Sequence, residues 1–273
     1  MLGTGTPNPE PHARGPATAI VVDGGAYLVD AGTGVVRRAA EAQTAYGIGG
    51  LAADQLDIVF LTHLHSDHTI GLPDLIHTSW VAERVGPLRV FGPVGTARMA
   101  DHLTGAWRAD IQNRLSGLQP SEPDGWRVET VEIGPGLVYE DSLVRVTAFA
   151  VPHTGWDESF GFRFETADRV IVLSGDTTPS RAVVDACAGC DVLVHEVYSL
   201  ETWRTRPEEW RRYHAGAHTS TEELAAIAAE ARPGLLVLHH QLHWGASPEE
   251  MLAEVAAAGY TGATVYGRDL DIY

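Results

Sequence analysis

The segment His63-Leu64-His65-Ser66-Asp67-His68 constrains this chain more than any other part of its sequence. It places three imidazoles and one carboxylate within six residues, directly after a run, Leu56–Thr62, whose apolar and β-branched residues predict a strand. Imidazole and carboxylate are ligands that zinc and related ions prefer, and a loop leaving a strand can direct several side chains to one point. The alternative is a polar loop that is merely rich in histidine. The pattern favours a metal site, because histidines seldom cluster without a ligand that offsets their repulsion.

Four ligands on one loop are too few for two ions, so further ligands are expected at the ends of other strands. Three predicted strands end in such residues, and a rigid sheet can hold each of them. These strand ends carry His153, Asp176 and the pair His239-His240.

The last ligand is His239 or His240. The runs Ile58–His63 and Leu235–His240 align as similar strands that end in histidine, and the alignment pairs His63 with His240. His240 is therefore the preferred ligand, and His239 and His243 are expected to lie around the site.

Short apolar runs that end at turn residues predict ten strands, and helical periodicity predicts six helices. The strands are Ala17–Val22, Ala26–Asp30, Leu56–Thr62, Leu88–Phe91, Val144–Val151, Phe160–Glu165, Val170–Ser174, Asp191–His195, Leu235–His239 and Ala263–Tyr266. The helices are Val35–Tyr46, Pro73–Arg84, Thr96–Leu115, Pro179–Ala188, Thr221–Ala231 and Pro248–Ala258. Helices follow strands in each half, which suggests two packed sheets with helices outside, an α/β fold.

Local signals refine this pattern. Pro179 and Pro248 stand where proline favours the first position of a helix, and Ser247 with Glu250 matches a capping box. The stretch Ser116–Gly125 is rich in turn residues and is expected to be a surface loop. No linker or low-complexity tract interrupts the chain, so one compact domain over residues 1–273 is the simplest expectation.

Charge and cysteine content narrow the possible functions. The net charge is −17, and every one of the 19 cationic side chains is arginine. Such a field disfavours extended nucleic acid as a partner. The two cysteines, Cys187 and Cys190, are too few for a disulfide framework, and they are expected to be small, partly buried thiols rather than half of a zinc site or a redox pair. No apolar run is long enough to span a membrane and no signal-peptide pattern begins the chain, so a cytoplasmic location is expected.

The order of these motifs resembles that of the metallo-β-lactamase superfamily, whose signature H-x-H-x-D-H is followed by a distant His, a distant Asp and a last His. The resemblance extends from Leu2-Gly3-Thr4-Gly5 to His240. It implies a four-layer αββα sandwich of two mixed sheets flanked by helices, with a dinuclear metal site. It further implies that the first ion is held by His63, His65 and His153, the second by Asp67, His68 and His240, with Asp176 bridging. Aspartate instead of cysteine at the bridging position argues against penicillin-type substrates.

Two further elements resemble the ribonuclease Z and phosphodiesterase branch of this superfamily. They are His195-Glu196 at a strand end and the segment His218-Thr219-Ser220-Thr221 that opens a helix. The resemblance implies that Glu196 orients His218, which protonates the leaving group. In the alternative interpretation His218 is an exposed loop residue next to a helix cap. Asp67, Glu196 and His218 are the candidate catalytic residues.

These features predict a hydrolase whose two divalent ions, zinc with manganese or iron as alternatives, generate hydroxide that attacks a small phosphodiester. The flexible, basic arm with which ribonuclease Z enzymes grip tRNA has no room in the short stretch between His153 and Asp176. Hydrolysis of lactones, carboxylic esters, thioesters or sulfate esters is the main alternative. A redox di-iron protein and a non-catalytic metal-binding relative are less favoured. A homodimer is implied by the resemblance alone.

Overall fold

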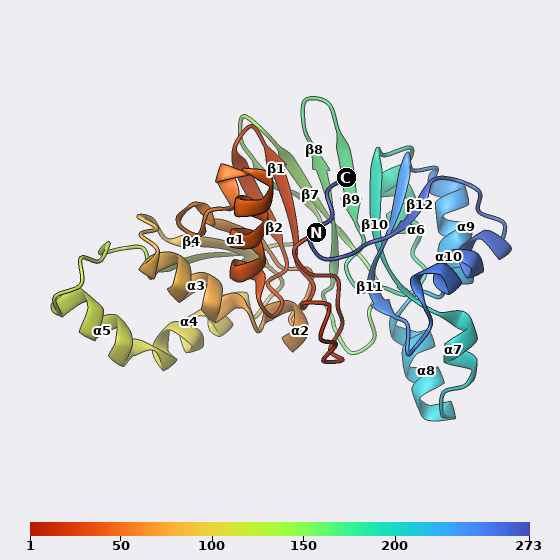
Figure 1. The fold of residues 1–273 in the computed structure, drawn as a ribbon, viewed down its shortest axis with the longest axis horizontal. Helices are drawn as coiled ribbons and strands as arrows, with labels where there is room; N and C mark the ends of the chain where they lie inside the picture. Colours follow the sequence, from red (N-terminus) through yellow and green to blue (C-terminus); the bar gives the residue numbers. More distant parts are fainter. The chain divides into compact units, whose positions relative to one another are not determined.

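The computed structural model describes all residues, Met1–Tyr273, and the chain divides into two compact units (Figure 1). Unit 1 comprises residues 1–133 and 268–272, and unit 2 comprises residues 134–267 and 273. Each unit has one sheet and its own hydrophobic core. The single domain expected from the sequence stays a prediction.

Unit 1 contains a five-stranded mixed sheet with the strand order β1-β2-β3-β4-β5. Only the hairpin β1–β2 is antiparallel, and its two-residue turn, Asp23-Gly24, has positive φ at both positions, as a tight hairpin requires. The other neighbours pair in parallel. The strands are β1 (Thr18–Val22), β2 (Gly25–Val29), β3 (Ile58–Phe60), β4 (Leu88–Gly92) and β5 (Val128–Glu132).

Helices cover the sheet of unit 1, and Figure 1 shows α1 and α3 side by side on one of its faces. Their apolar side chains and those of β2, β3 and β4 form the core, because residues three and four apart share one face of a helix. The helical elements are α1 (Val35–Tyr46), η1 (Gly49–Leu51), η2 (Ala53–Gln55), α2 (Ser66–Thr69), α3 (Leu72–Val81), α4 (Thr96–Ala106) and α5 (Arg108–Ser116).

Unit 2 contains a seven-stranded mixed sheet with the order β12-β11-β10-β9-β8-β7-β6. The first three neighbouring pairs are parallel and the last three are antiparallel. The strands are β6 (Gly136–Glu140), β7 (Arg145–Ala150), β8 (Phe160–Glu165), β9 (Val170–Leu173), β10 (Val192–Tyr198), β11 (Leu235–Leu242) and β12 (Thr264–Tyr266).

The core of unit 2 lies between its sheet and three helices, α6 (Arg181–Cys187), α9 (Thr221–Ala231) and α10 (Pro248–Ala257). Two more helices, α7 (Leu200–Arg204) and α8 (Glu208–Ala217), follow β10 and extend beyond the sheet at the lower right of Figure 1. All seven residues of β10 are buried. That strand therefore forms a rigid support for any functional group that it carries.

The structure confirms the predicted class, two mixed sheets flanked by helices, and every predicted strand and helix has a counterpart. Strands β5 and β6 were not predicted, because most of their residues are exposed or half-buried and give little hydrophobic signal. The capping box of Ser247 and Glu250 is confirmed. The helix expected over Thr96–Leu115 is interrupted at Trp107, which separates α4 from α5.

Two expectations about unit 2 were wrong, and helices α7 and α8 were not predicted. Pro179 does not begin a helix, because Ser180 is the cap of α6 and accepts a hydrogen bond from the Ala182 amide. Cys187 and Cys190 are joined in a disulfide rather than left as thiols. The chain reverses through Ala188 and Gly189, both at positive φ, which brings the two buried cysteines within 4.7 Å between their Cα atoms.

Residues Gly117–Gly125 form most of the connection between α5 and β5, and Leu118 in this segment is fully exposed. The expected surface loop is therefore confirmed. The loop is attached to α3 by a hydrogen bond of 2.8 Å that Trp80 Nε1 donates to the Glu122 carbonyl. No helix in this structure is both long and apolar enough to pass through a membrane.

Arg84 is only 2% exposed and connects separate parts of unit 1. Its guanidinium donates hydrogen bonds of 2.8–3.0 Å to four backbone carbonyls, those of Leu56, Leu75, Ile76 and Gly125. Burial lowers the pKa of Arg84 to about 10, so the side chain stays charged at neutral pH. A buried cation needs such a complete set of acceptors.

We expect Arg84→Met to lower the free energy of unfolding by about 3 kcal/mol, because four buried carbonyls lose their donor. Urea denaturation followed by circular dichroism measures the change. The matched control is Arg127→Met, which removes an exposed ion pair with Asp124 and should change the free energy by less than about 0.5 kcal/mol. Equal effects of the two substitutions would contradict this role of Arg84.

Candidate metal centre

The imidazoles of unit 1 lie where β3 ends. Beyond Phe60 the chain passes through Leu61 and Thr62 to His63, and His65 is the N-cap residue of the short helix α2. His63 and His68 are buried, whereas His65 and Asp67 are half-buried. The end of one strand and the first turn of one helix therefore hold all four predicted ligands of this unit.

Asp30, which follows β2, is the carboxylate around which this group is organised. Its Oδ1 accepts a hydrogen bond of 2.8 Å from the Thr62 amide, and its Oδ2 accepts one of 2.7 Å from His68 Nδ1. Thr62 Oγ1 donates its single proton to the same carboxylate, 3.0 Å from Oδ2. Strands β2 and β3 are parallel neighbours, so their carboxyl ends meet at one edge of the sheet and bring Asp30 to Thr62.

These hydrogen bonds determine which ring nitrogen of each histidine carries the proton. His68 donates from Nδ1 to Asp30, so its lone pair is on Nε2. Since Thr62 Oγ1 uses its proton on Asp30, it accepts from His63 Nδ1 at 3.0 Å, and the lone pair of His63 is also on Nε2. His63 Nε2 lies 2.9 Å from His65 Nδ1. Two ring nitrogens that converge in this way suit a shared cation.

Asp67 lies beside His68, with 3.4 Å between Asp67 Oδ2 and His68 Nε2. Asp67 also lines a cavity of about 360 Å³ in unit 1, together with Thr6, Asn8, Arg14 and Ser66. Solvent and small solutes therefore have access to the carboxylate.

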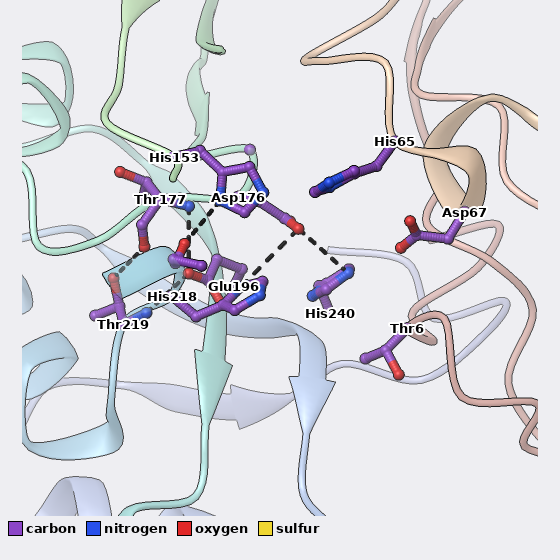
Figure 2. Close-up of polar contacts among 12 residues, drawn as sticks. Thr6, His65, Asp67, His153, Asp176, Thr177, Glu196, His218, Thr219 and His240 are labelled. Atoms are coloured by element: carbon purple, nitrogen blue, oxygen red, sulfur yellow. Dashed lines mark hydrogen bonds and ion pairs between the residues drawn. The ribbon is translucent and has the colours of Figure 1, made fainter. Parts of the chain in front are cut away.

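Unit 2 gathers the other predicted residues around Asp176, which follows β9 after a glycine, Gly175, at positive φ (Figure 2). Asp176 Oδ2 lies 3.5 Å from His240 Nε2 and 4.0 Å from His218 Nδ1. All three side chains are buried, and their potential ligand atoms lie within 4.8 Å of one another.

A bulge in β11 orients His240. Glu196 of β10 is opposite His239 and Val197 is opposite Gln241, so His240 is an extra residue without a pairing position, and its φ is 44°. The bulge directs the side chain of His240 toward Asp176, whereas His239 keeps its place in the ladder and is half-buried.

Glu196 and His218 form the second pair in this unit (Figure 2). Glu196 Oε1 accepts hydrogen bonds from the amides of Thr177 and Thr219, at 3.3 and 2.9 Å, and Glu196 Oε2 lies 3.3 Å from His218 Nδ1. Ser220 and Glu223 form a capping box on α9, so the predicted cap exists, but His218 is buried rather than exposed.

His153 follows β7 and is buried beside the same group. Its Nδ1 lies 2.8 Å from the Ala217 carbonyl, which can only accept, so the lone pair of His153 is on Nε2. The ring centroids of His153 and His218 are 5.3 Å apart. Unit 2 therefore brings together all five of its predicted residues, His153, Asp176, Glu196, His218 and His240.

Burial dominates the electrostatics of unit 2. It raises the pKa of Glu196 well above its ordinary value, and the neighbouring Asp176 carboxylate raises it further. Burial lowers the pKa of His195 to about 4, and it lowers the pKa of His214 to about 4, with an additional contribution from His218. Two carboxylates buried side by side need cations or protons to offset their repulsion.

The donor set of each unit fits divalent metal ions. Three histidines have tautomers that leave Nε2 as the ligand atom, and carboxylates accompany the imidazoles in both units. In these three histidines, His63, His68 and His153, the other ring nitrogen has a hydrogen-bond partner, which is how proteins orient such ligands. The residues therefore define the class of metal-binding centres built on strand ends.

The comparisons with known proteins agree with this class. The family described as beta-lactamase superfamily domain matches residues 26–241, and the chain belongs to that family. It is 36% identical over 277 residues to a protein of Mycobacterium marinum named ribonuclease Z, covering 99% of this chain and 95% of the relative. A ribonuclease Z of Mycobacterium bovis is 35% identical over the same shares of the two chains.

Solved structures with low sequence identity share the fold. The metallo-β-lactamase fold protein YhfI of Bacillus subtilis superposes with a TM-score of 0.70 at 17% identity, covering 98% of this chain and 95% of that one. The short form of human tRNase Z gives a TM-score of 0.69 at 22% identity, with 99% and 96% covered. The expected resemblance and fold class are confirmed, and the protein is a metal-dependent hydrolase.

Asp30, Thr62, Thr177 and Thr219 are site residues that the sequence did not reveal. Asp30 had a weak signal, since it ends a predicted strand in the first half of the chain. Thr177 and Thr219 act through backbone amides, which carry no residue-specific signal.

We expect Asp30→Asn to weaken zinc binding about 10- to 100-fold, because the amide cannot hold the Nδ1 proton of His68 and the hydroxyl proton of Thr62 as a carboxylate does. Calorimetric titration of metal-free protein measures the affinity. Asp23→Asn, at the exposed β1–β2 turn, is the matched control. Unchanged affinity in a folded Asp30→Asn variant would show that this carboxylate does not orient the ligands.

Proposed function

We propose that this protein hydrolyses phosphodiester bonds with two divalent metal ions, zinc being the first candidate. The ion ligands would be His63, His65 and Asp67, with His68 from the same loop, and His153, Asp176 and His240 from unit 2. The observation that carries the proposal is the buried Glu196–His218 pair next to Asp176 and His240, because it adds a proton donor to a set of metal ligands.

Two such ions, when bound, lower the pKa of a water molecule and polarise the phosphodiester oxygens. Asp176 would be a ligand of these ions, and its burial beside His240 keeps the carboxylate in a defined orientation. Asp67, which lines the cavity in unit 1, would hold both a metal ion and the attacking water in place. Asp67 would therefore be both a metal ligand and a catalytic residue.

His218 would protonate the leaving oxygen. Glu196 faces His218 Nδ1 at 3.3 Å, so the transferable proton is on Nε2. The carboxylate itself is held by two backbone amides, and it stabilises the imidazolium form of His218. The buried location of the pair keeps water from competing for this proton.

We expect His218→Ala to lower kcat about 100-fold or more for phosphodiesters with an alkoxide leaving group, which needs a proton to depart. The loss should be much smaller for esters of p-nitrophenol, whose leaving group departs without protonation. Steady-state kinetics on both substrate types measure the difference, and metal content checks that the ions remain bound. His102→Ala, on the exposed side of α4, is the control. Equal losses on both substrate types would refute the acid role.

The preferred substrate is a small phosphodiester, such as a cyclic nucleotide. A net charge of −17 and the absence of lysine oppose binding of a long polyanion, whereas metal ions supply positive charge locally for a small one. Only the hairpin β8–β9 separates His153 from Asp176, which leaves no room for a basic arm.

Processing of RNA 3′ ends is the second candidate, and a specific observation favours it. The relatives named ribonuclease Z align with this chain almost from end to end, so they match it in length. The short connection between His153 and Asp176 therefore does not distinguish this chain from them. Lactone, carboxylic ester, thioester and sulfate-ester substrates have no comparable support, and a homodimer stays a prediction.

We expect the metal-loaded protein to hydrolyse bis(p-nitrophenyl) phosphate and a 2′,3′-cyclic nucleotide, and to leave a precursor tRNA with a 3′ trailer intact at physiological salt. Release of nitrophenolate, chromatography and gel electrophoresis measure the three reactions. Efficient removal of the trailer would favour the second candidate. No hydrolysis of any phosphodiester, together with activity on a lactone or thioester, would overturn the proposal.

A further inference from the structure

Helix α8 presents an aromatic face that leads to His218. Trp210, Tyr213, His214 and Ala217 are spaced so that they lie on one side of the helix, and His218 is its C-cap residue. The ring centroids of Trp210 and Tyr213 are 6.0 Å apart, and those of Tyr213 and His218 are 6.3 Å apart. A continuous row of rings therefore connects the proposed proton donor to the surface.

The outer two rings of this row are open to solvent. Trp210 is 47% exposed and Tyr213 is 43% exposed, whereas His214 beneath them is buried. Most large aromatic side chains of a stable fold are buried. Two neighbouring aromatic side chains that stay exposed next to a reactive group are typical of a binding surface.

Contacts with α7 and with the loop after β11 hold this face in place. Trp203 Nε1 donates a hydrogen bond of 3.0 Å to the Arg211 carbonyl, and the Arg211 guanidinium lies over the Trp203 ring. Arg206 lies over the Trp244 ring, which packs 4.5 Å from the His214 ring between centroids. The exposed rings therefore project from a fixed base, which lowers the entropic cost of binding a flat ligand.

The surrounding charge suits an anion. The segment from Trp203 to Tyr213 contains four arginines and two glutamates in a chain whose net charge is −17. Arg212 pairs with Glu208 at 3.1 Å, but both side chains are at least three-quarters exposed. An ion pair of this kind contributes little, so the guanidinium can contact a phosphate instead.

We propose that Tyr213 and Trp210 form a stacking platform for a nucleobase of the substrate, so that the enzyme prefers nucleotide phosphodiesters over other phosphodiesters. This inference rests on the proposed function, since the platform leads to the proton donor of that reaction. A nucleobase has the flat π-face that such rings bind, and the attached phosphate matches the local positive charge. An alkyl or glycerol phosphodiester offers no such face.

Two substrates with the same leaving group test the platform. Thymidine 5′-(p-nitrophenyl phosphate) and ethyl p-nitrophenyl phosphate release the same nitrophenolate and differ in the group that stays on phosphorus. We expect the wild-type enzyme to favour the nucleotide substrate in kcat/KM, and Tyr213→Leu to reduce that preference about tenfold, as loss of one base–aromatic stack does. Tyr213→Phe should retain the preference, because the ring remains.

Tyr46→Leu is the matched control. Tyr46 is 50% exposed at the end of α1 in unit 1, and its replacement should leave the substrate preference unchanged. Metal content and thermal melting show whether each variant is folded and loaded. Trp210→Leu should reduce the preference in the same direction as Tyr213→Leu.

The possible results separate this inference from the proposed function. Hydrolysis of neither substrate by the metal-loaded wild type would mean that the proposed function fails. Hydrolysis of both with a preference that Tyr213→Leu does not alter would overturn the platform alone. Inhibition by AMP is compared with inhibition by a short single-stranded oligoribonucleotide. The comparison shows whether the stacked nucleobase belongs to a mononucleotide or to a polynucleotide. In either case the stronger competitor must lose potency in Tyr213→Leu, and equal potency would contradict the stacking role.

Discussion

A carboxylate buried within a strand or just after one must be surrounded by hydrogen-bond donors, and each of the two units meets this constraint with its own residues. Asp30 satisfies it in unit 1 with a backbone amide, a hydroxyl and an imidazole, and Glu196 satisfies it in unit 2 with two amides and an imidazole. Each carboxylate thereby orients one histidine. The placement of the remaining ligands follows from the strands and turns that bring these donors together.

The sequence predicted the fold class and the identity of the chemistry-bearing side chains, because both depend on strong local patterns. The run from His63 to His68 follows a short, fully buried strand, and Asp176 and His153 likewise follow strands that have apolar patterns. The preference for His240 came from a strand alignment, and the bulge that turns this residue toward Asp176 was not visible in the sequence. Pairing between strands that are about 40 residues apart decides where a bulge lies, and no local pattern records it.

The structural features that the sequence did not predict also have physical causes. Strands β5 and β6 are largely exposed and show no clear hydrophobic period. Helices α7 and α8 are rich in charged residues, and α7 is only five residues long, so the aromatic face of α8 was not recognised as helical. The disulfide between Cys187 and Cys190 depends on a reversal of the chain through two residues at positive φ, one of which is an alanine. A residue of that type gives no hint that it adopts a left-handed conformation. The role of Asp30 depends on the parallel pairing of β2 with β3, which single-sequence patterns do not specify.

The bulge in β11 has a consequence for how such a centre can vary. Because the residues on both sides of His240 stay paired with β10, with the register shifted by one residue, the strand contributes a reactive imidazole and its ladder continues beyond it. A substitution at position 240 can thus change which group the strand presents to Asp176, while the apolar core of unit 2 is left undisturbed. The architecture separates the residues that can diversify from those that maintain the folded state, and one inserted amino acid is enough to do so.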